Sequence, residues 1–533
     1  MENQFQSPLL RRDDPESTLR HLPPSLDTAP ALTLRPYQQQ AVDGVFAAWS
    51  EFDRVLGVAP TGSGKTIKFA HIAKRRAQTG RVLILAHRDE LLDQARDKIS
   101  RAVGLLADKD KADDYASLES DIVVASVQTL SRRDRLLRFP RNHFVTVIID
   151  EAHRSLADSY QRILTHFDHA KVLGVTATPD RGDRRSLSRF YEDIAFEISL
   201  TDLIRAGWLC PIKIKTVPLQ IDITEVGIRG GDYSEEELAE ALAPALQKLA
   251  EAIKEHAGDR KTLVFLPLVR TSYQFANILR EHGLAAEAIC GESADRKEIL
   301  ERFSNGETQL LCNAMLLVEG YDCPSIDCVV CLRPTTIRSL FAQQVGRGTR
   351  IHSGKENLLL LDFLWLSREH NLVRPASLIA KDEVEQSELE AQLGAADGDL
   401  LEAESLASAE REAALKACLD ERRRERGSEV DLLELADRWH APDLLDYVPT
   451  FAWERAEPTA KQIDVLRRHG IDLALVGDRG HASALISALF AHLETVPATD
   501  KQKRYLRFLG HPNPEGLTKR AAGRAIAELA PSR

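Results

Sequence analysis

Long apolar runs are missing from this sequence of 533 residues. No run approaches the roughly 20 apolar residues that a helix needs to cross a bilayer, and the first 20 residues lack the apolar core of a signal peptide. We therefore expect a cytoplasmic protein that does not associate with membranes. An excess of basic charge is missing too, because the formal net charge is −11. That balance excludes a protein coated with basic charge, but it allows a local basic track for nucleic acid.

Cysteine is scarce, and the seven cysteines are scattered along the chain. An odd and dispersed set indicates reduced thiols rather than a disulfide framework. Cys328 and Cys331 have CxxC spacing, but they lie in the apolar run IDCVVCL, which predicts a strand. Residues three apart on a strand point to opposite faces, and no second CxxC or paired histidine completes a ligand set. We therefore expect two core cysteines and no zinc site.

Two series of short apolar runs, separated by helical patterns, are what the chain does contain. The first series is Val55–Val58, Val82–Ala86, Ile122–Ala125, Val145–Ile149 and Val172–Val175, and the second, from Lys261 onward, is TLVFL, AEAIC, QLLCNAM, CVVCL and NLLLLDF. Such continuous runs are typical of buried parallel strands. Since the chain is also too long for one hydrophobic core, the pattern predicts an α/β fold with two units in tandem.

Changes of composition suggest further boundaries. We expect a flexible tail (1–31), a first α/β domain (32–210), a connecting segment (211–244), a second α/β domain (245–378), an acidic linker with helices (379–457) and a basic helical region (458–533). The acidic stretch 381–405 predicts a solvated helix or linker.

The basic region contains an internal repeat of 40 residues. Thr459, Lys461, Gln462, Leu466, Arg467 and Gly470 recur as Thr499, Lys501, Gln502, Leu506, Arg507 and Gly510. Each copy predicts a Thr-capped helix that ends at a glycine, followed by a loop and a second helix. Two interpretations stay open: a duplicated packing module, or a DNA contact through Lys501, Lys503, Arg504 and Arg507.

A phosphate-binding loop follows the first apolar run. The segment from Ala59 to Thr66, APTGSGKT, stands between a predicted strand and the helical stretch IKFAHIAKRRA. Glycines let backbone N–H groups face phosphates, Lys65 would reach the β- and γ-phosphates, and the Thr66 hydroxyl would bind Mg²⁺. The candidate nucleotide-binding residues here are Thr61, Gly62, Ser63, Gly64, Lys65 and Thr66.

A second acidic motif follows the run Val145–Ile149. There the sequence continues as Asp150-Glu-Ala-His153, which is a strand ending in carboxylates. Asp150 would hold Mg²⁺, and Glu151 would orient and polarise the attacking water. Together with the phosphate loop, these residues predict a site for ATP and Mg²⁺.

Between residues 33 and 370 the sequence resembles superfamily 2 helicases, motif by motif. The matching segments are Leu34-Arg-Pro-Tyr-Gln38, the phosphate loop, AHRDEL from Ala86, VASVQTL from Val124, DEAH, Thr176-Ala-Thr178, Glu319-Gly-Tyr-Asp322 and QQVGRGTR from Gln343. Ala59 stands where the general phosphate-loop pattern has Gly, as is common in helicases. The wording of the last two motifs is similar to the RadD/XPB-like branch and to type III restriction translocases. No cysteine cluster follows the motor, so the resemblance ends near residue 375.

The resemblance implies two RecA-like domains with ATP in the cleft between them, and a mostly helical C-terminal region. It assigns nucleotide binding to Arg35, Gln38, Gly320, Asp322 and Gln343, and catalysis to Lys65, Glu151 and the arginine fingers Arg347 and Arg350. It assigns coupling between the ATP site and the strand to His153, Thr176 and Thr178. Backbone contacts to nucleic acid fall to Arg88, Ser126, Gln128 and Thr129.

The function that we expect is an ATP-dependent DNA helicase or translocase, active in DNA repair or recombination, with 3′–5′ polarity implied by the resemblance alone. Its partners would be DNA and other repair proteins. Three alternatives stay open: a duplex translocase of a restriction or phage-defence system, an RNA remodeller, and a non-catalytic adaptor. No evident PD-(D/E)xK nuclease motif supports the first of these, and the intact set of Lys65, Asp150, Glu151 and Arg347 argues against the last.

Overall fold

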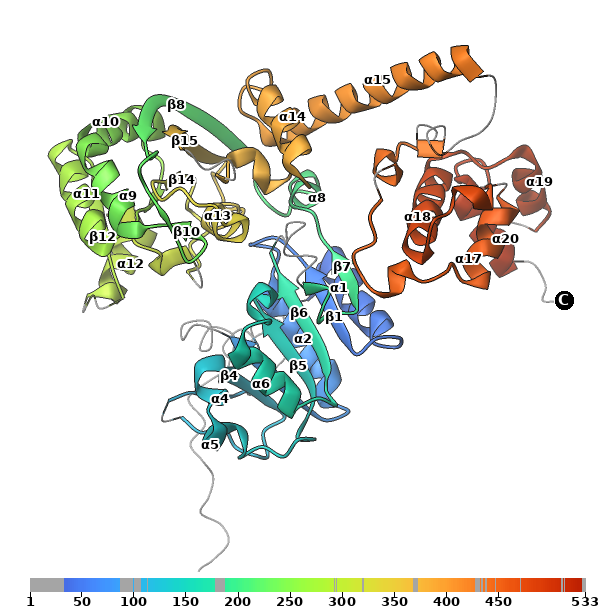
Figure 1. The fold of residues 1–533 in the computed structure, drawn as a ribbon, viewed down its shortest axis with the longest axis horizontal. Coiled ribbons are helices and arrows are strands. Elements are labelled where there is room, and N and C mark those ends of the chain that lie inside the picture. The colour runs from blue at the N-terminus through green and yellow to red at the C-terminus, as the bar shows by residue number, and fades with distance from the viewer. Residues whose placement is uncertain are drawn as a thin grey trace, which may run out of the picture.

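The structure is a computed structural model. It describes residues 33–529 except 87–98, 100–106, 113, 178–186, 292, 294, 319–320, 368–371, 427–431, 433–434, 437–438, 446, 470, 510 and 512. Its first two units are α/β domains with parallel sheets, as the sequence predicts, and a helical region follows (Figure 1).

The first domain is built on a seven-stranded sheet in the order β3-β4-β2-β5-β6-β1-β7. Its strands are β1 (Arg54–Val58), β2 (Arg81–Ala86), β3 (Asp108–Asp110), β4 (Ile122–Ser126), β5 (Phe144–Asp150), β6 (Lys171–Thr176) and β7 (Asp193–Glu197). Every neighbouring pair runs parallel. The carboxyl ends of all seven strands therefore lie at one edge, where the predicted motifs gather.

Both faces of this sheet are covered, because alternate residues of its strands enter two separate cores. In β2, Leu83 and Leu85 belong to one core, and Val82 and Ile84 belong to the other. The described helices are α1 (Pro36–Ala48), α2 (Lys65–Ala77), α4 (Val127–Leu130), α5 (Arg133–Leu136) and α6 (Asp158–His166), and a 3₁₀ turn, η1 (Ala152–Arg154), follows β5. Burial on both faces explains the continuous apolar runs of the sequence.

The second domain has a six-stranded parallel sheet in the order β12-β13-β11-β14-β15-β8. Its strands are β8 (Ile212–Asp222), β11 (Thr262–Phe265), β12 (Ala286–Ile289), β13 (Leu310–Asn313), β14 (Cys328–Cys331) and β15 (Leu358–Leu366). One part of this sheet differs from the prediction. Residues 211–244 were expected to connect the domains, whereas β8 pairs with β15 along its whole length and forms the edge of the sheet.

The rest of the expected connector also has its own structure. It contains a small antiparallel hairpin of β9 (Ile228–Arg229) and β10 (Asp232–Tyr233), followed by α9 (Glu235–Leu242), the turn η2 (Ala243–Ala245) and α10 (Leu246–Ala257). Helix α8 (Leu200–Arg205), which was expected to belong to the first domain, packs into the core of the second through Leu203 and Ile204. The second unit therefore begins near residue 199, because these segments bury their apolar side chains against its sheet.

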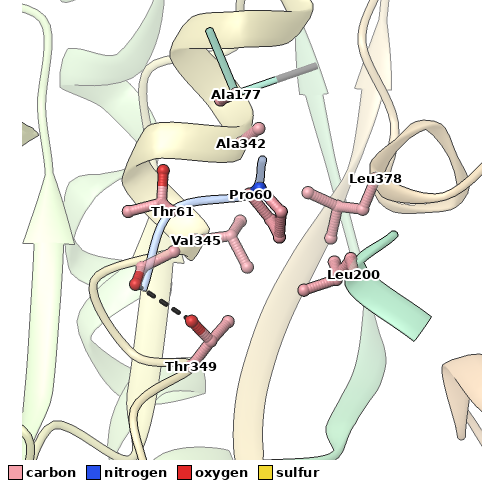
Figure 2. Close-up of a pocket in the computed structure, with 9 residues that line it drawn as sticks. Pro60, Thr61, Ala177, Leu200, Ala342, Val345, Thr349 and Leu378 are labelled. Carbon is pink, nitrogen blue, oxygen red and sulfur yellow. Dashed lines mark hydrogen bonds between the residues drawn. The ribbon is translucent and has the colours of Figure 1, made fainter. Parts of the chain in front are cut away.

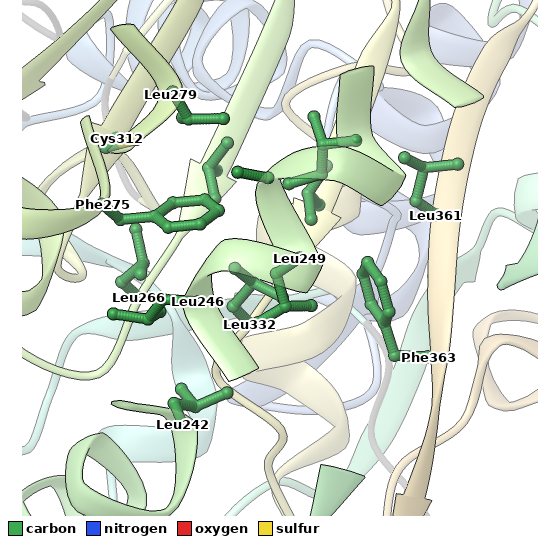
Figure 3. Packing of buried hydrophobic residues seen from close by; sticks show 14 of the residues in the cluster. Leu242, Leu246, Leu249, Leu266, Phe275, Leu279, Cys312, Leu332, Leu361 and Phe363 are labelled. Carbon is green, nitrogen blue, oxygen red and sulfur yellow. The ribbon is translucent and has the colours of Figure 1, made fainter. Parts of the chain in front are cut away.

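The core of the second domain lies between its sheet and helices α9, α10 and α11 (Val269–Glu281) (Figure 3). Leu242, Leu249, Phe275 and Phe363 meet there. Cys328 faces this core, whereas Cys331 faces the core on the other side of the sheet. The two thiols of the CxxC spacing thus point to opposite faces of β14. Helices α12 (Arg296–Asn305) and α13 (Arg338–Val345) and the 3₁₀ turn η3 (Leu316–Val318) complete the domain.

The acidic stretch forms two helices that dock on the second domain, α14 (Glu383–Leu393) and α15 (Leu400–Arg426). The turn between them meets β8, where Ile214 N donates to Gly398 O over 2.8 Å. Leu389 and Leu400 are fully buried. The stretch is therefore solvated on one side only, and α15 then extends away from the domain (Figure 1).

The C-terminal region consists of two helical hairpins, as the repeat predicts. They comprise α17 (Ala460–Arg468) with α18 (Arg479–Thr495), and α19 (Asp500–Phe508) with α20 (Lys519–Leu529). Thr459 and Thr499 each close a capping box with the glutamine three residues later. The same glutamines, Gln462 and Gln502, donate to Arg479 O and Lys519 O, so the 40-residue offset holds in the hydrogen bonds.

An aromatic contact joins this region to the first domain. Trp453, in the turn η6 (Trp453–Arg455), lies with its ring centroid 6.5 Å from that of Phe52. Within the described part of the chain, no helix combines the length and the apolar character that crossing a membrane requires.

Candidate functional site

The phosphate loop is held from below by the first turn of α1. Gln38 Nε2 and the Tyr37 hydroxyl both donate to Ser63 O, over 3.2 and 3.0 Å. Gly64 has a φ of 75°, and a Cβ at that position would lie 2.4 Å from Gln38 Nε2. Only glycine fits there, because the left-handed backbone and the close side chain both exclude a larger residue. The loop therefore turns tightly and directs Lys65, the first residue of α2, toward the carboxyl edge of the sheet.

Lys65 and Glu151 meet at that edge. Lys65 Nζ lies 3.6 Å from Glu151 Oε1, and both side chains are nearly buried. Burial by itself would raise the pKa of Glu151, but Lys65, then His153, Arg154 and Arg347, hold the pKa below its usual value. Glu151 is therefore a carboxylate at neutral pH, which is the form that can orient water.

The backbone at Glu151 is strained. Its φ of 55° and ψ of 58° place it in the left-handed region, which a residue with a long side chain rarely adopts. Its N–H donates to Asp150 Oδ1 over 3.0 Å. Strain of this kind persists where the surroundings determine the conformation, and it concentrates at functional sites. The strained residue Glu151 comes directly after β5, which ends at Asp150, so both carboxylates stand at the carboxyl edge of the sheet.

His153 links Glu151 to the next motif. Its Nδ1 lies 3.5 Å from Glu151 Oε2 and 3.5 Å from Thr176 Oγ1. Burial lowers the pKa of His153, although Glu151 opposes this shift, so the imidazole is neutral at neutral pH. Both contacts involve the same ring nitrogen, so Nδ1 stands between the carboxylate and the hydroxyl. Two of the three predicted coupling residues are thus in contact, and Thr178 lies outside the described residues.

The predicted arginine fingers come from the second domain and rest on the segment around Tyr321. Arg347 Nη1 donates to Tyr321 O over 2.8 Å, and Arg350 Nε lies 3.1 Å from Asp322 Oδ1. The charge of Arg347 contributes to lowering the pKa of Glu151, so the second domain influences this carboxylate electrostatically. Gln343 is buried on the same helix, α13. Gly320 lies outside the described residues.

The two domains touch directly where the phosphate loop meets the end of α13 (Figure 2). A Cβ on Gly346 would lie 2.4 Å from Thr61 Cβ, so glycine is needed for this approach. Pro60, Thr61 and Ala177 from the first domain face Val345 and Thr349 from the second across a small, mainly apolar pocket. Thr349 Oγ1 donates to Gly346 O, which ties the turn that follows α13. The turn that follows α13 and the phosphate loop are therefore in direct contact.

The residues present fit a nucleoside triphosphate with Mg²⁺. Among the described residues, Lys65 Nζ is buried without a hydrogen-bond partner, as a lysine reserved for a phosphate would be. Thr66 follows β1 and Asp150 ends β5, and only β6 separates these strands in the sheet. A hydroxyl and a carboxylate are oxygen donors that suit Mg²⁺. We therefore treat this edge as the candidate ATP site.

Arg35, which was expected to bind nucleotide, contacts the aromatic side chain of Trp208. The guanidinium carbon of Arg35 lies 4.7 Å from the Trp208 ring centroid, and the ring of Tyr37 lies 6.0 Å from it. Trp208 follows α8 and packs against a core of the second domain. This cation–aromatic group therefore joins the start of the first domain to the second domain.

The predicted nucleic-acid residues are only partly available to a ligand. Ser126 and Thr129 are buried, and Gln128 is exposed. Ser126 Oγ donates to Gln128 Oε1 over 2.8 Å, and Thr129 Oγ1 accepts from Ala112 N over 3.3 Å. Ser126 and Thr129 thus hold local structure at the end of β4. Arg88 lies outside the described residues.

Sequence reasoning missed Lys68, which lies under the phosphate loop. Its side chain is 1% exposed, and Nζ lies 3.3 Å from Ser63 Oγ. Burial, and then the charge of Lys65, lower the pKa of Lys68 to about 7. The phosphate-loop motif specifies Lys65 but no residue at position 68. Only the packing of the structure shows that Lys68 is buried next to it.

Asp232 was missed as well. This buried residue of the hairpin accepts from Thr335 Oγ1 over 2.8 Å and from Thr336 N over 2.9 Å, and it lies 3.4 Å from Arg333 Nη2. It thereby ties the hairpin to the loop that leads into α13. The hairpin and His153 line a common cleft between the domains. Because Asp232 is more than 100 residues from its partners, no local pattern could indicate it.

Comparisons with known proteins agree with the geometry. Residues 31–181 match the family model "Type III restriction enzyme, res subunit", and residues 244–352 match "Helicase conserved C-terminal domain". The "Putative ATP-dependent helicase IRC3" of Saccharomyces cerevisiae is 32% identical over 382 residues, which are 67% of this chain and 55% of that protein. The "DNA 3'-5' translocase XPB2" of Sulfurisphaera tokodaii is 24% identical over 62% of this chain and 81% of its own length.

A solved structure extends the similarity of fold beyond the motor. The ATP-dependent type ISP restriction-modification enzyme LlaBIII, solved bound to DNA, aligns with a TM-score of 0.52 at 15% sequence identity. The alignment covers 93% of this chain and 43% of that enzyme. This chain also spans little more than half the length of the yeast relative.

Proposed function

We propose that this chain, a superfamily 2 helicase with a motor of the restriction-enzyme type, is an ATP-driven motor acting on DNA. The family assignment follows from the matches of residues 31–181 and 244–352 and from the similarity to the yeast helicase. The observation that carries the proposal is that charges from both domains act on Glu151. Lys65 Nζ lies 3.6 Å from this carboxylate, and Arg347 from the other domain lowers its pKa. Because the site takes residues from both domains, the distance between Glu151 and Arg347 would change when the domains move apart.

ATP, when bound with Mg²⁺, supplies the phosphoryl group whose transfer to water releases the free energy. Lys65 would hold the phosphates, while Thr66 and Asp150 would hold the metal ion. Glu151 is a carboxylate that can orient water, and Arg347 and Arg350 are permanently charged donors suited to phosphate oxygens. In the structure Arg347 donates to Tyr321 O and Arg350 pairs with Asp322. These contacts would be exchanged for phosphate oxygens when ATP binds.

Hydrolysis would weaken the link between the domains, because the transferred phosphate would be held by Lys65 from the first domain and by Arg347 and Arg350 from the second. His153 and Thr176 lie between Glu151 and the edge of β6, so they are placed to pass the change to the nucleic-acid side. In this way each hydrolysis event would move the two α/β domains relative to one another while both hold the nucleic-acid strand.

DNA is the polymer that we propose. The translocase from Sulfurisphaera tokodaii carries DNA in its name, and the motifs from Glu319 to Arg350 resemble the branch that contains DNA repair motors. A role in DNA repair or recombination would follow. A duplex translocase of a restriction system is the second candidate, because the family model that matches residues 31–181 is named for a restriction subunit.

Steady-state ATP hydrolysis tests the proposal directly. Rates are measured with no polymer and with single-stranded DNA, duplex DNA, forked DNA and RNA, at one moderate salt concentration because backbone binding depends on salt. We expect strong stimulation by DNA and little by RNA, and the most effective form of DNA separates unwinding from duplex translocation. Stimulation by RNA alone would overturn the choice of polymer, and absence of hydrolysis with every polymer would overturn the motor.

A further inference from the structure

Tyr115 is an exposed aromatic residue whose position is held by charged groups. It is 62% exposed, although its ring is packed against two guanidinium groups. The guanidinium carbon of Arg135 lies 3.6 Å from the ring centroid, and that of Arg138 lies 4.6 Å from it. An aromatic ring in such contact with cations is oriented, while most of this residue remains open to solvent.

The support under the ring is a buried ion cluster around Asp110. Asp110 is 0% exposed, and its two oxygens lie 3.2 Å from Arg135 Nε and 3.3 Å from Arg138 Nη1. Asp110 Oδ2 also accepts from Ala116 N over 3.2 Å, next to Tyr115 itself. Buried and hydrogen-bonded charges favour one arrangement strongly, because any other leaves a charge unpaired. The ring is therefore presented in a defined orientation.

The cluster stands at the edge where nucleic acid is expected. Strands β3 and β4 run parallel and end together, and the Lys111–Asp114 turn that follows β3 touches the segment that follows β4 through Ala112 N and Thr129 Oγ1. Arg132 and Arg133, which continue that segment, are both exposed. The aromatic ring thus has exposed basic residues nearby in the chain that supports it.

We propose that Tyr115 is a stacking platform for one unpaired base of a single-stranded nucleic acid, with Arg132 and Arg133 contacting the neighbouring phosphates. The inference rests on the proposed function and names a contact surface for its strand. Every base presents an aromatic face, so a preoriented ring beside cations binds strands without reading their sequence. Ser126 and Thr129 are buried, so their side chains are not open to a strand. The ring of Tyr115, on the same edge of the domain, is exposed.

Fluorescence anisotropy with a labelled oligothymidylate of about 20 nucleotides tests the platform. Tyr115→Leu keeps an apolar group over the guanidiniums but cannot stack, so we expect roughly ten-fold weaker binding. Tyr115→Phe keeps the ring, and its affinity should stay within about two-fold of the wild type. Leu137→Ala is the matched control, because Leu137 is also 62% exposed and adjoins Arg138. This control should bind as the wild type does.

Salt and duplex DNA separate stacking from charge. Tyr115→Leu should leave the salt dependence of binding unchanged, whereas Arg132→Ala with Arg133→Ala should reduce its slope. Binding of a blunt duplex should be unaffected by Tyr115→Leu, since its bases are already stacked. If the wild type binds single strands and Tyr115→Leu binds them equally well, or loses duplex binding as strongly, the platform is wrong. If the wild type binds no nucleic acid, the proposed function fails instead.

Discussion

The cations of the interdomain cleft and those of the C-terminal repeats act on carboxylates that differ in burial. In the cleft, Lys65 and Arg347 come from different domains and converge on the single carboxylate of Glu151. In the repeats, Lys503 lies 3.4 Å from Glu515, and Arg520 and Arg524 lie 3.1 and 2.6 Å from Glu494. The repeats contain twelve Lys and Arg against seven Asp and Glu, yet several of these cations are paired within the second hairpin or between the two hairpins.

The difference shows that the net charge of a segment does not measure its capacity to bind a polyanion. Exposed ion pairs add little stability, but each one places a carboxylate where a phosphate would have to approach. Of the two interpretations left open for the repeats, these pairs favour the packing module. In the cleft the shared acid, Glu151, is nearly buried, whereas Glu494 and Glu515 are partly exposed, so solvent screens the charges of the cleft less.

Removal of either charge at the centre of the cleft should have the largest effect. For Lys65→Ala and Glu151→Gln we expect ATP turnover to fall roughly 100-fold or more, since phosphoryl transfer depends on positioned charge. Lys74→Ala, an exposed cation on the same helix α2, is the matched control and should hydrolyse ATP normally. Steady-state hydrolysis and circular dichroism are measured together. Normal turnover in either site variant would contradict our assignment of the site.

Lys68 sharpens the comparison, because it is buried under the phosphate loop and, among the described residues, no carboxylate contributes to its pKa. Its pKa is about 7 in the folded protein against 10.5 as a free lysine. Between these pH values the unfolded state binds more protons than the folded state, so this group makes stability rise with pH there, and its full cost is present below about 7.

Lys68→Met should therefore stabilise the protein, on the order of 2 kcal/mol at pH 6.5 and less at pH 9. Denaturant unfolding of the wild type and the variant at both pH values measures this difference. A gain that does not change with pH would show that Lys68 is not buried as a charge. Lys74→Met, at an exposed position, should show no such dependence.

The smallest effect is expected in the repeats. Arg507 pairs with Glu515 as Arg524 does with Glu494. For the double variant Arg507→Ala with Arg524→Ala, the affinity for single-stranded and duplex DNA should stay within about two-fold of the wild type, because these cations are already paired. Anisotropy at low and moderate salt checks this. A loss greater than about ten-fold would restore the DNA-contact interpretation.

The sequence predicted most strands of both sheets, because buried parallel strands are continuous apolar runs. It missed β8, whose residues alternate between buried and exposed positions and include Pro218. β8 is an edge strand, and its register shifts against β15 between Phe363 and Leu364, which lets a proline be accommodated. A proline in a half-exposed segment is typical of a connector, so only the pairing with β15 distinguishes the two.

Part of the candidate site was predictable for a similar reason. Lys65 and Thr66 come after the loop that follows β1, and Asp150 and Glu151 stand at the end of β5. Local motifs mark these residues, and parallel strands bring their carboxyl ends to one edge. Lys68 and Asp232 carry no motif, because their importance comes from burial against partners elsewhere in the chain. Arg88, Thr178 and Gly320 lie outside the described residues and keep the roles that the resemblance implies.

By itself, the sequence determined which residues can do chemistry and which runs become strands, because strand–loop–helix motifs and apolar periodicity are local properties. It also determined the two capped hairpins, since a capping box needs only four consecutive residues. The tertiary structure decided which charges remain available. Asp110 pairs with Arg135 and Arg138, Glu494 with Arg520 and Arg524, and Glu515 with Lys503 and Arg507. Packing alone brings these groups together. Whether a cation meets a carboxylate depends on contacts between segments distant in the chain, which no local pattern specifies.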